Sequence, residues 1–428
     1  MGISSRAKEK IVGFCEKTIE IALYVLIFCL PFSKALIEIA ATFMIFAWLL
    51  KRSLTGAIGF PSSNIFTRFK PISTYLNLPI ALYIITTFIS VILSNNFSLS
   101  LKNFFSKIME YIFLYFIVAE CVSTRRMLKN TFIILFISAG MIGIDCLFQS
   151  FFGFDFLRLR TMEAERITGS FQMPGDLAAY LEPALCLLLS FWFLRFKKGI
   201  SYWLRMESIL LLVLLVASLS RAGWLGFSVG VCFLGSVENK KILFVVFATF
   251  LISMITQFYL LKSPVNIIGH LRGIFSFSDF SSLDRKDIWL AALRMIKDKP
   301  LFGHGLSTFM GNFTRYCPDY YYYLKHSIIP YAHNCYLQMA AESGLFGLAS
   351  FLYLIVKFFV HTVASLKKIK DGFFHAALSG ISAGIIALLV HAAFDTTFYS
   401  LQLIIFFWIM LAINAGLQEP AFDNARQG

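Results

Sequence analysis

The feature that most constrains this chain is a succession of apolar runs, each long enough to cross a lipid bilayer. A helix needs about 20 residues to span about 30 Å of hydrocarbon. Runs of about this length lie at 18–33, 35–50, 77–93, 108–122, 131–152, 174–195, 206–219, 222–237, 242–261, 336–362, 374–393 and 400–417. We therefore predict an all-α fold, a polytopic membrane helix bundle with about 12 transmembrane helices.

The composition agrees with a lipid-embedded protein and excludes most other classes. Hydrophobic residues make up 58% of the 428 residues and charged residues 14%, whereas soluble proteins average about 45–50% and about 25%. Too few polar residues remain to cover a water-exposed surface, which excludes soluble, disordered and disulfide-rich secreted proteins. The net charge of +14 fits basic cytoplasmic loops, so we expect membrane lipids and no nucleic acid as partners.

The basic residues of the connecting loops predict the orientation of the bundle. Taken alternately from the N-terminus, one set of connections carries roughly three times as many Lys and Arg residues as the short loops of the other set. Because basic loops stay in the cytoplasm, both termini are predicted to be cytoplasmic. The basic start and apolar stretch of 1–35 also resemble a signal peptide, but the many spans that follow favour a first transmembrane helix.

One connection on the outer side is much longer than the others, and we expect the functional residues to lie in it. It divides the chain into 1–261 with about nine spans, an outer loop at 262–335 with surface helices, and 336–428 with about three spans and a cytoplasmic C-terminus. Long loops on a rigid scaffold often carry functional residues. A covering loop without chemistry is the alternative.

The outer loop contains a predicted helix at 284–299, capped by Ser282 or Asp284 and ended by the proline that follows. Its predicted apolar face comprises Ile288, Trp289, Ala292, Leu293 and Ile296. Arg285 points toward this face and Arg294 points away from it. A buried Arg at a membrane surface is costly unless an anion meets it, and phosphate fits the guanidinium fork. Snorkelling to lipid headgroups is the alternative.

Two further arginines lie at the outer ends of predicted spans. Arg221 lies in the segment SLSRAGW at 218–224, whose small residues allow a ligand to approach closely. Arg166 precedes the segment TGSF and is the weaker candidate, because pairing with Glu163 or Glu165 explains it equally well. We predict that both contribute to a phosphate site, with a snorkelling side chain as the alternative for Arg221.

His333 is the strongest candidate for a catalytic base. It lies at the N-terminus of a long apolar helix, where the helix dipole disfavours the protonated ring, so we expect a neutral imidazole that accepts a proton near about pH 7. Asn334, Gln338 and Glu342 follow at four-residue spacing and form a polar stripe that must face the bundle or a wet cavity. A helix cap at Asn334 and a structural His are the alternatives.

The other polar signals suggest smaller roles. The four tyrosines at 320–323 could stack on sugars, but an aromatic belt at the membrane interface explains them equally well. His304 is predicted to lie in a turn, and His391 and Asp395 are predicted to hydrogen-bond each other in a structural role. The sequence contains no Asp-x-Asp, zinc or Walker motif, so we expect no metal and no cofactor.

The order and spacing of these motifs resemble the bacterial O-antigen ligase and O-antigen polymerase superfamily of membrane glycosyltransferases. The resemblance is carried by SRAG at 220–223, RKDIW at 285–289, DKPLFGHG at 298–305, HNCYLQ at 333–338 and ESGLFG at 342–347. Arg166 with GSF at 169–171 is a further matching element. Each motif alone is a weak signal, and their combined order carries the resemblance.

The resemblance implies a metal-independent glycosyltransferase of the bacterial inner membrane whose active site faces the periplasm. It implies a glycan on undecaprenyl pyrophosphate as the donor and, for a ligase, lipid A–core as the acceptor. The essential His of the family matches His333, and its essential arginines match Arg221 and Arg285. We expect these arginines, with Arg166, to hold the pyrophosphate while His333 deprotonates the attacking sugar hydroxyl, which inverts the anomeric centre.

Two other functions stay open from the sequence. An O-antigen polymerase uses the same chemistry on a different acceptor, although the motifs read closer to those of ligases. A lipid-linked glycan flippase or another transporter belongs to a different class. Transporters often contain inverted repeats, and we find no repeat in this sequence.

Overall fold

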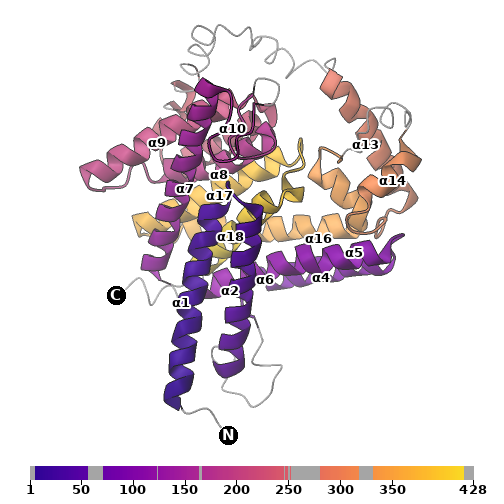
Figure 1. Cartoon of the computed structure of the whole chain (residues 1–428), viewed down its shortest axis with the longest axis horizontal. Helices are drawn as coiled ribbons and strands as arrows, with labels where there is room; N and C mark the ends of the chain where they lie inside the picture. The colour runs from indigo at the N-terminus through magenta and orange to yellow at the C-terminus, as the bar shows by residue number, and fades with distance from the viewer. Residues whose placement is uncertain are drawn as a thin grey trace.

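A computed structural model describes residues 5–55, 71–122, 124–162, 166–244, 246–248, 251, 280–317 and 331–418. These residues are predominantly helical, and the only β-type pairing among them is an isolated bridge between Phe154 and Thr161. The predicted all-α class is therefore confirmed for the described part of the chain. Figure 1 shows how the helices are arranged.

The helices follow the predicted apolar runs closely. In chain order they are α1 (Ser5–Cys29), α2 (Lys34–Thr55), α4 (Asn77–Ile92), α5 (Phe97–Asn103), the π-helix η1 (Phe104–Met109), α6 (Glu110–Cys121), α7 (Arg125–Phe152), α8 (Pro174–Ser190), α9 (Lys198–Ala217), α10 (Arg221–Val237), α13 (Phe280–Asp298), α14 (Phe309–Tyr316), α16 (Cys335–Leu366), α17 (Gly372–His391), the 3-10 helix η2 (Thr397–Tyr399) and α18 (Leu401–Leu417). Every predicted run overlaps one of these helices except 242–261, most of which lies outside the described residues.

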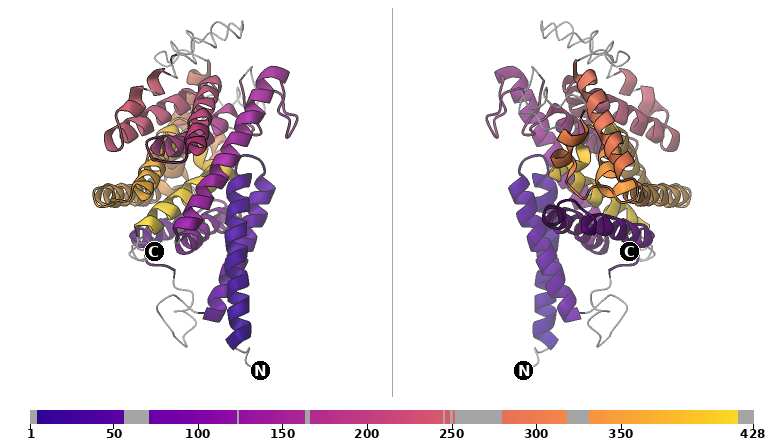
Figure 2. Two further views of the ribbon diagram at one scale, coloured as in Figure 1. Left: turned by 90° about the vertical axis from the view of Figure 1, so that its left-hand side faces the viewer. Right: turned by 90° about the vertical axis from the view of Figure 1, so that its right-hand side faces the viewer.

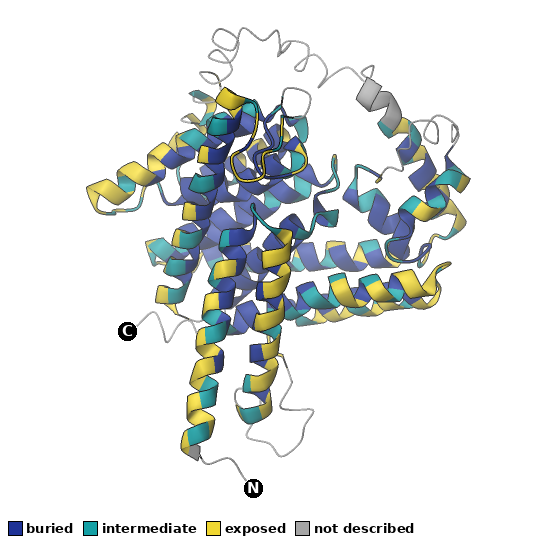
Figure 3. Ribbon diagram, viewed as in Figure 1, coloured by how far each residue is buried: buried dark blue, intermediate teal, exposed yellow. Residues whose placement is uncertain are grey.

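Several helices have the length and composition of membrane spans. In the described part of the chain, α7, α9, α16 and α17 are long and apolar enough to cross a bilayer, and α4, α10 and α18 are apolar but shorter. Exposed surface runs along α1 and α2 (Figure 3), and it includes the apolar side chains of Phe14, Phe43 and Phe46. Such a surface suits contact with lipid. The chain is a helical membrane protein, but the predicted count of about 12 spans is not confirmed.

The core of the bundle lies around α8, α17 and α18. Helices α8, α10 and α17 pack on one another, α18 packs on α6 and α17, and α18 is buried along nearly its whole length. The helices α1 and α2 form a hairpin that projects beyond the rest of the bundle at the end that carries the N-terminus, as Figures 1 and 2 show. In Figure 1, α13 and α14 lie over one end of α16.

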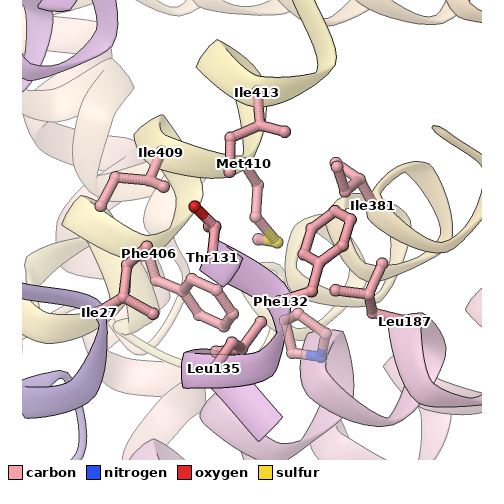
Figure 4. Close-up of a pocket in the computed structure, with 11 residues that line it drawn as sticks. Ile27, Thr131, Phe132, Leu135, Leu187, Ile381, Phe406, Ile409, Met410 and Ile413 are labelled. Carbon is pink, nitrogen blue, oxygen red and sulfur yellow. The ribbon is translucent and has the colours of Figure 1, made fainter. Parts of the chain in front are cut away.

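A small apolar cavity lies inside this core, between α1, α7, α8, α17 and α18 (Figure 4). Its volume is about 20 Å³, and its lining includes Ile27, Phe132 and Met410 with the hydroxyl-bearing Thr131. This is about the space that one water molecule needs. No substrate fits there, so the functional site must be sought elsewhere.

A break in α16 positions the outer loop. Gly344 has φ +72° inside an otherwise helical segment. Beyond the break, the N–H of Leu345 donates to the carbonyl of Pro300 at 2.8 Å, and the N–H of Gly305 donates to the carbonyl of Glu342 at 2.8 Å. The two sequence motifs at 298–305 and 342–347 therefore bind each other, and the loop segment replaces helical hydrogen bonds lost at the break.

The predicted outer helix exists, but its start and its buried face differ from the prediction. Helix α13 begins at Phe280, so Ser282 and Asp284 lie inside it and do not cap it. The predicted end, just before Pro300, agrees with the structure. The described buried side chains are Ile288, Ala291, Ala292 and Met295, and the predicted core residue Leu293 is 52% exposed. The face differs because α13 packs against both α14 and α16, whereas helical periodicity alone assumes one partner.

The break at Gly344 yields a stability prediction. A Cβ at Gly344 would lie 2.2 Å from the carbonyl oxygen of Leu301, and φ +72° is strained for any L-residue. We expect Gly344→Ala to lower the free energy of unfolding by about 1–3 kcal/mol or more. Gly311→Ala in α14 is the matched control, because nothing lies within 4 Å of its Cβ position. Thermal unfolding in detergent measures both variants, and equal midpoints would contradict this account of the break.

Candidate active site

His333 lies where the start of α16 meets the turn that follows α17. Asn334 is the N-cap of α16, and its side chain accepts hydrogen bonds from two N–H groups of the first turn, both at 3.0 Å. The N–H of Cys335 donates to the carbonyl of Ala392 at 2.8 Å, which fixes the helix start against the α17 turn. His333 itself has φ +46°, a conformation that non-glycine residues seldom adopt. The capping explanation therefore accounts for Asn334.

Asp395 connects His333 to the buried core. Its Oδ1 lies 3.5 Å from His333 Nδ1, and its Oδ2 lies 3.7 Å from His391 Nε2. His391 is fully buried, and its Nδ1 lies 2.6 Å from Oε1 of Glu182 on α8. Burial acts to raise the pKa of Asp395, but hydrogen bonding from His333 and the proximity of His391 lower that pKa well below its ordinary value. Asp395 is therefore an anion that faces two imidazoles.

The structure gives Asp395, which is predicted from the sequence to have a structural role, a contact that the sequence does not predict. Asp395 contacts His391 as predicted, but it also contacts His333, the candidate base. One feature of the sequence could have pointed to a functional role for Asp395. It lies four residues after a His at a helix end, and ionisable residues at a membrane edge are often functional. No local pattern links this pair to His333.

Two of the three candidate arginines interact electrostatically with each other. Arg285 extends from the second turn of α13 and is partly buried. Burial lowers the pKa of Arg285, the nearby Asp395 opposes this shift, and the nearby Arg221 lowers the pKa further. Arg221 is the first residue of α10, where the Ser220 side chain caps the helix by accepting from the N–H of Gly223 at 3.2 Å. Elements far apart in the sequence thus bring Arg285 near both Arg221 and Asp395.

Arg166 joins this cluster through the turn that precedes α10. Its Nε donates to the carbonyl oxygen of Ser218 at 2.9 Å, three residues before Arg221. The alternative partners Glu163 and Glu165 lie outside the described residues. Arg166 is therefore a neighbour of the Arg221 turn.

The polar stripe on α16 faces the protein and holds the outer loop. Gln338 and Glu342 are each 1% exposed. The carboxylate of Glu342 accepts from the N–H groups of Ser307 and Phe309 at 3.0 and 3.3 Å, and from Gln338 Nε2 at 3.2 Å. The side-chain oxygen of Gln338 accepts from the N–H of Ala332 at 3.0 Å. The stripe thus fixes the backbone on both sides of the outer loop.

The side chains of Trp289 and His304 connect α13 to the segments around His333 and α16. Trp289 Nε1 donates to the carbonyl of Ala332, next to His333, at 2.9 Å. His304 is fully buried, and its Nε2 lies 3.1 Å from the carbonyl of Met295. His304 lies in the predicted turn between two glycines with positive φ, and its buried contacts support a structural role. The tyrosines at 320–323 lie outside the described residues.

The arrangement offers acid–base chemistry next to an anion site. The His333 side chain is 34% exposed, so a substrate hydroxyl can reach it, and Asp395 orients the ring. The guanidinium pair of Arg285 and Arg221 favours negative charge nearby. Within the described ranges, no group of three or more His, Cys, Asp or Glu side chains is arranged to hold a metal ion. The cluster can therefore accept a proton and stabilise an anion.

Comparison with known proteins agrees with these observations. Residues 208–352 match a family model described as O-Antigen ligase, a range that includes Arg221, Arg285, His333 and Glu342 but neither Arg166 nor Asp395. A curated O-antigen ligase of Salmonella typhimurium strain LT2 is 26% identical over 301 residues, which cover 68% of this chain and 71% of that protein. These two matches support the O-antigen ligase superfamily as the family of this chain.

Proposed function

We propose that this chain is an O-antigen ligase of the bacterial inner membrane that transfers a glycan from undecaprenyl pyrophosphate to a sugar hydroxyl of lipid A–core. Its similarity to the superfamily supports the reaction class. The observation that carries the proposal is the position of His333 Nδ1 3.5 Å from Asp395 Oδ1, with Arg285 near enough for its charge to interact with those of Asp395 and Arg221. Glycosyl transfer from a diphosphate needs a cation site for the leaving group and a base for the hydroxyl.

The two arginines of the proposed site stabilise the diphosphate as it leaves the donor sugar. When the bond between the sugar and the diphosphate breaks, the diphosphate takes the electron pair and its negative charge increases. Preorganised cations at a poorly hydrated site stabilise that charge in the transition state. Arg285 and Arg221 are the proposed cations, and Arg166 supports the Arg221 turn through Ser218.

His333 accounts for activation of the acceptor. With Nδ1–H directed at Asp395 Oδ1, the lone pair on Nε2 is free to take the proton of the attacking hydroxyl. The hydroxyl oxygen then forms the new bond to the anomeric carbon, and Asp395 stabilises the imidazolium that results. Attack opposite the departing diphosphate inverts the anomeric centre.

The excess of basic residues in one set of loops supports cytoplasmic termini and a periplasmic active site. Among the alternatives, the name of the curated relative favours a ligase over a polymerase, and no observation favours a transporter. The glycans of a deletion strain separate the first two, because loss of a ligase leaves bare core and loss of a polymerase leaves core capped with one repeat unit.

Removal of the proposed base tests the mechanism. We expect His333→Ala to lower kcat by about 10²–10⁴-fold. His375→Ala is the matched control, because His375 also contacts a carboxylate, Glu238 at 2.8 Å, but lies at the opposite end of α17 from His391. The assay joins lipid-linked glycan to lipid A–core in nanodiscs without ATP or added metal. Wild-type turnover by His333→Ala would eliminate the proposed base.

Substitutions of Arg285 test the contribution of its charge to activity, with a control arginine on the same helix. We expect Arg285→Gln to lower kcat/KM by about 10²–10³-fold, because one donor to the developing anion is lost. Arg285→Lys should recover part of the activity, since it keeps the charge but not the bidentate fork. Arg294→Gln is the control on α13, where Arg294 is exposed and contacts the carbonyl of Tyr316. Equal losses at the two arginines would refute the anion site.

Asp395→Asn tests whether the carboxylate positions the base. We expect kcat to fall by about 10–100-fold with the KM for the donor unchanged, as for other groups that orient a functional His. Asp371→Asn is the control at the other end of α17, where Asp371 caps the helix and Asn can still cap it. A change in donor KM without a change in kcat would show that Asp395 does not act through His333.

A further inference from the structure

A second basic site lies beside the cluster described above. A cavity of about 240 Å³ opens between the start of α2, the loop after α7 and the start of α8. Three cations line it, Lys34, Arg158 and Arg160, together with the single carboxylate of Asp176 and the amide of Gln402. Asp176 lies near enough to Lys34 for their charges to interact. The lining therefore carries an excess of positive charge that suits an anionic ligand.

The loop that carries the two arginines is held by a buried acid. Asp155 is fully buried, and its two carboxylate oxygens accept from the backbone N–H groups of Arg158 and Arg160, both at 2.6 Å. The guanidinium group of Arg158 contacts the carbonyl of Phe32, and that of Arg160 donates to the carbonyl of Ser170 at 3.4 Å. Neutral carbonyl oxygens thus orient both guanidinium groups, and the nearby carboxylate of Asp155 offsets part of the Arg158 charge.

The end of α7 and the loop that follows it present apolar side chains to the outside. Phe151, Phe152, Phe156 and Leu159 are 82%, 62%, 41% and 71% exposed. Exposed aromatic and aliphatic side chains beside basic residues suit the membrane interface, where the apolar groups enter the acyl region and the cations meet phosphates. The ligand that fits both features is a phosphate group attached to a lipid.

The cavity shares the first turn of α8 with the proposed active site. Asp176 lines the cavity, and a Cβ at the preceding Gly175 would lie 2.4 Å from Asp395 Oδ2. Asp395 in turn contacts His333. The cavity is therefore connected to the proposed catalytic base through the first turn of α8 and Asp395.

We propose that this cavity binds a phosphate group of the acceptor glycolipid and thereby positions the acceptor for attack. The proposal rests on the proposed function, because it assumes a lipid-borne acceptor. The acceptor fits better than the donor, since Arg285 and Arg221 already provide a separate cation site for the donor diphosphate. Binding of the acceptor by its phosphate fixes the sugar while its reacting hydroxyl remains free.

The double variant Arg158→Gln/Arg160→Gln tests this assignment. In phosphatidylcholine nanodiscs we expect the KM for phosphorylated lipid A–core to rise about 10-fold or more, with kcat and the donor KM close to wild type. With enzymatically dephosphorylated lipid A–core, the wild type and the variant should have the same KM. Arg125→Gln/Arg126→Gln removes the same charge at the opposite end of α7 and should leave the acceptor KM unchanged.

A binding measurement separates this proposal from the proposed function. Fluorescently labelled lipid A–core should bind the His333→Ala variant with wild-type affinity, and the two cavity substitutions should weaken that binding about 10-fold or more. Because this readout needs no turnover, it tests the cavity even if His333 is not the base. A raised donor KM would assign the cavity to the donor, and equal competition by phosphatidylglycerol would assign it to bulk lipid. Either result, or unchanged acceptor binding, overturns the proposal.

Discussion

Two guanidinium groups that are withdrawn from bulk water and lie near each other repel unless negative charge stands beside them. In this protein Arg285 and Arg221 are such a pair, and Asp395 is an anion near Arg285. One carboxylate offsets part of the repulsion, and in the proposed reaction the diphosphate supplies the rest as its charge grows. The same carboxylate contacts His333. A single partly buried acid thereby links the proposed anion site to the proposed base.

The fold delivers these groups from four elements that are distant in the sequence. The arginines begin α10 and extend from α13, His333 precedes α16, and Asp395 follows α17. The motifs at 298–305 and 342–347 contribute scaffold, because each completes the hydrogen bonds of the other at the Gly344 break. Glu342 and Gln338 have the same role for the backbone of the outer loop. Much of what resembles a family signature therefore holds the backbone around the proposed site in place.

The helices and the partial burial of Arg285 on α13 could be predicted from the sequence, because both depend on local periodicity. The exposure of Leu293 could not, since the buried face of α13 is set by two packing partners. The contact of Asp395 with His333 spans 62 residues and leaves no local pattern. The cavity lined by Arg158 and Arg160 could not be predicted either, because both residues read as ordinary loop charges until Asp155 and the start of α8 are placed around them.

The most direct test of the central claim is a structure of the protein in lipid with an undecaprenyl pyrophosphate-linked glycan bound. The account predicts the diphosphate within hydrogen-bond distance of Arg221 and Arg285, with the imidazole of His333 on the opposite side of the anomeric carbon. A diphosphate bound instead among Lys34, Arg158 and Arg160, or at the end of the bundle that carries the N-terminus, would contradict it.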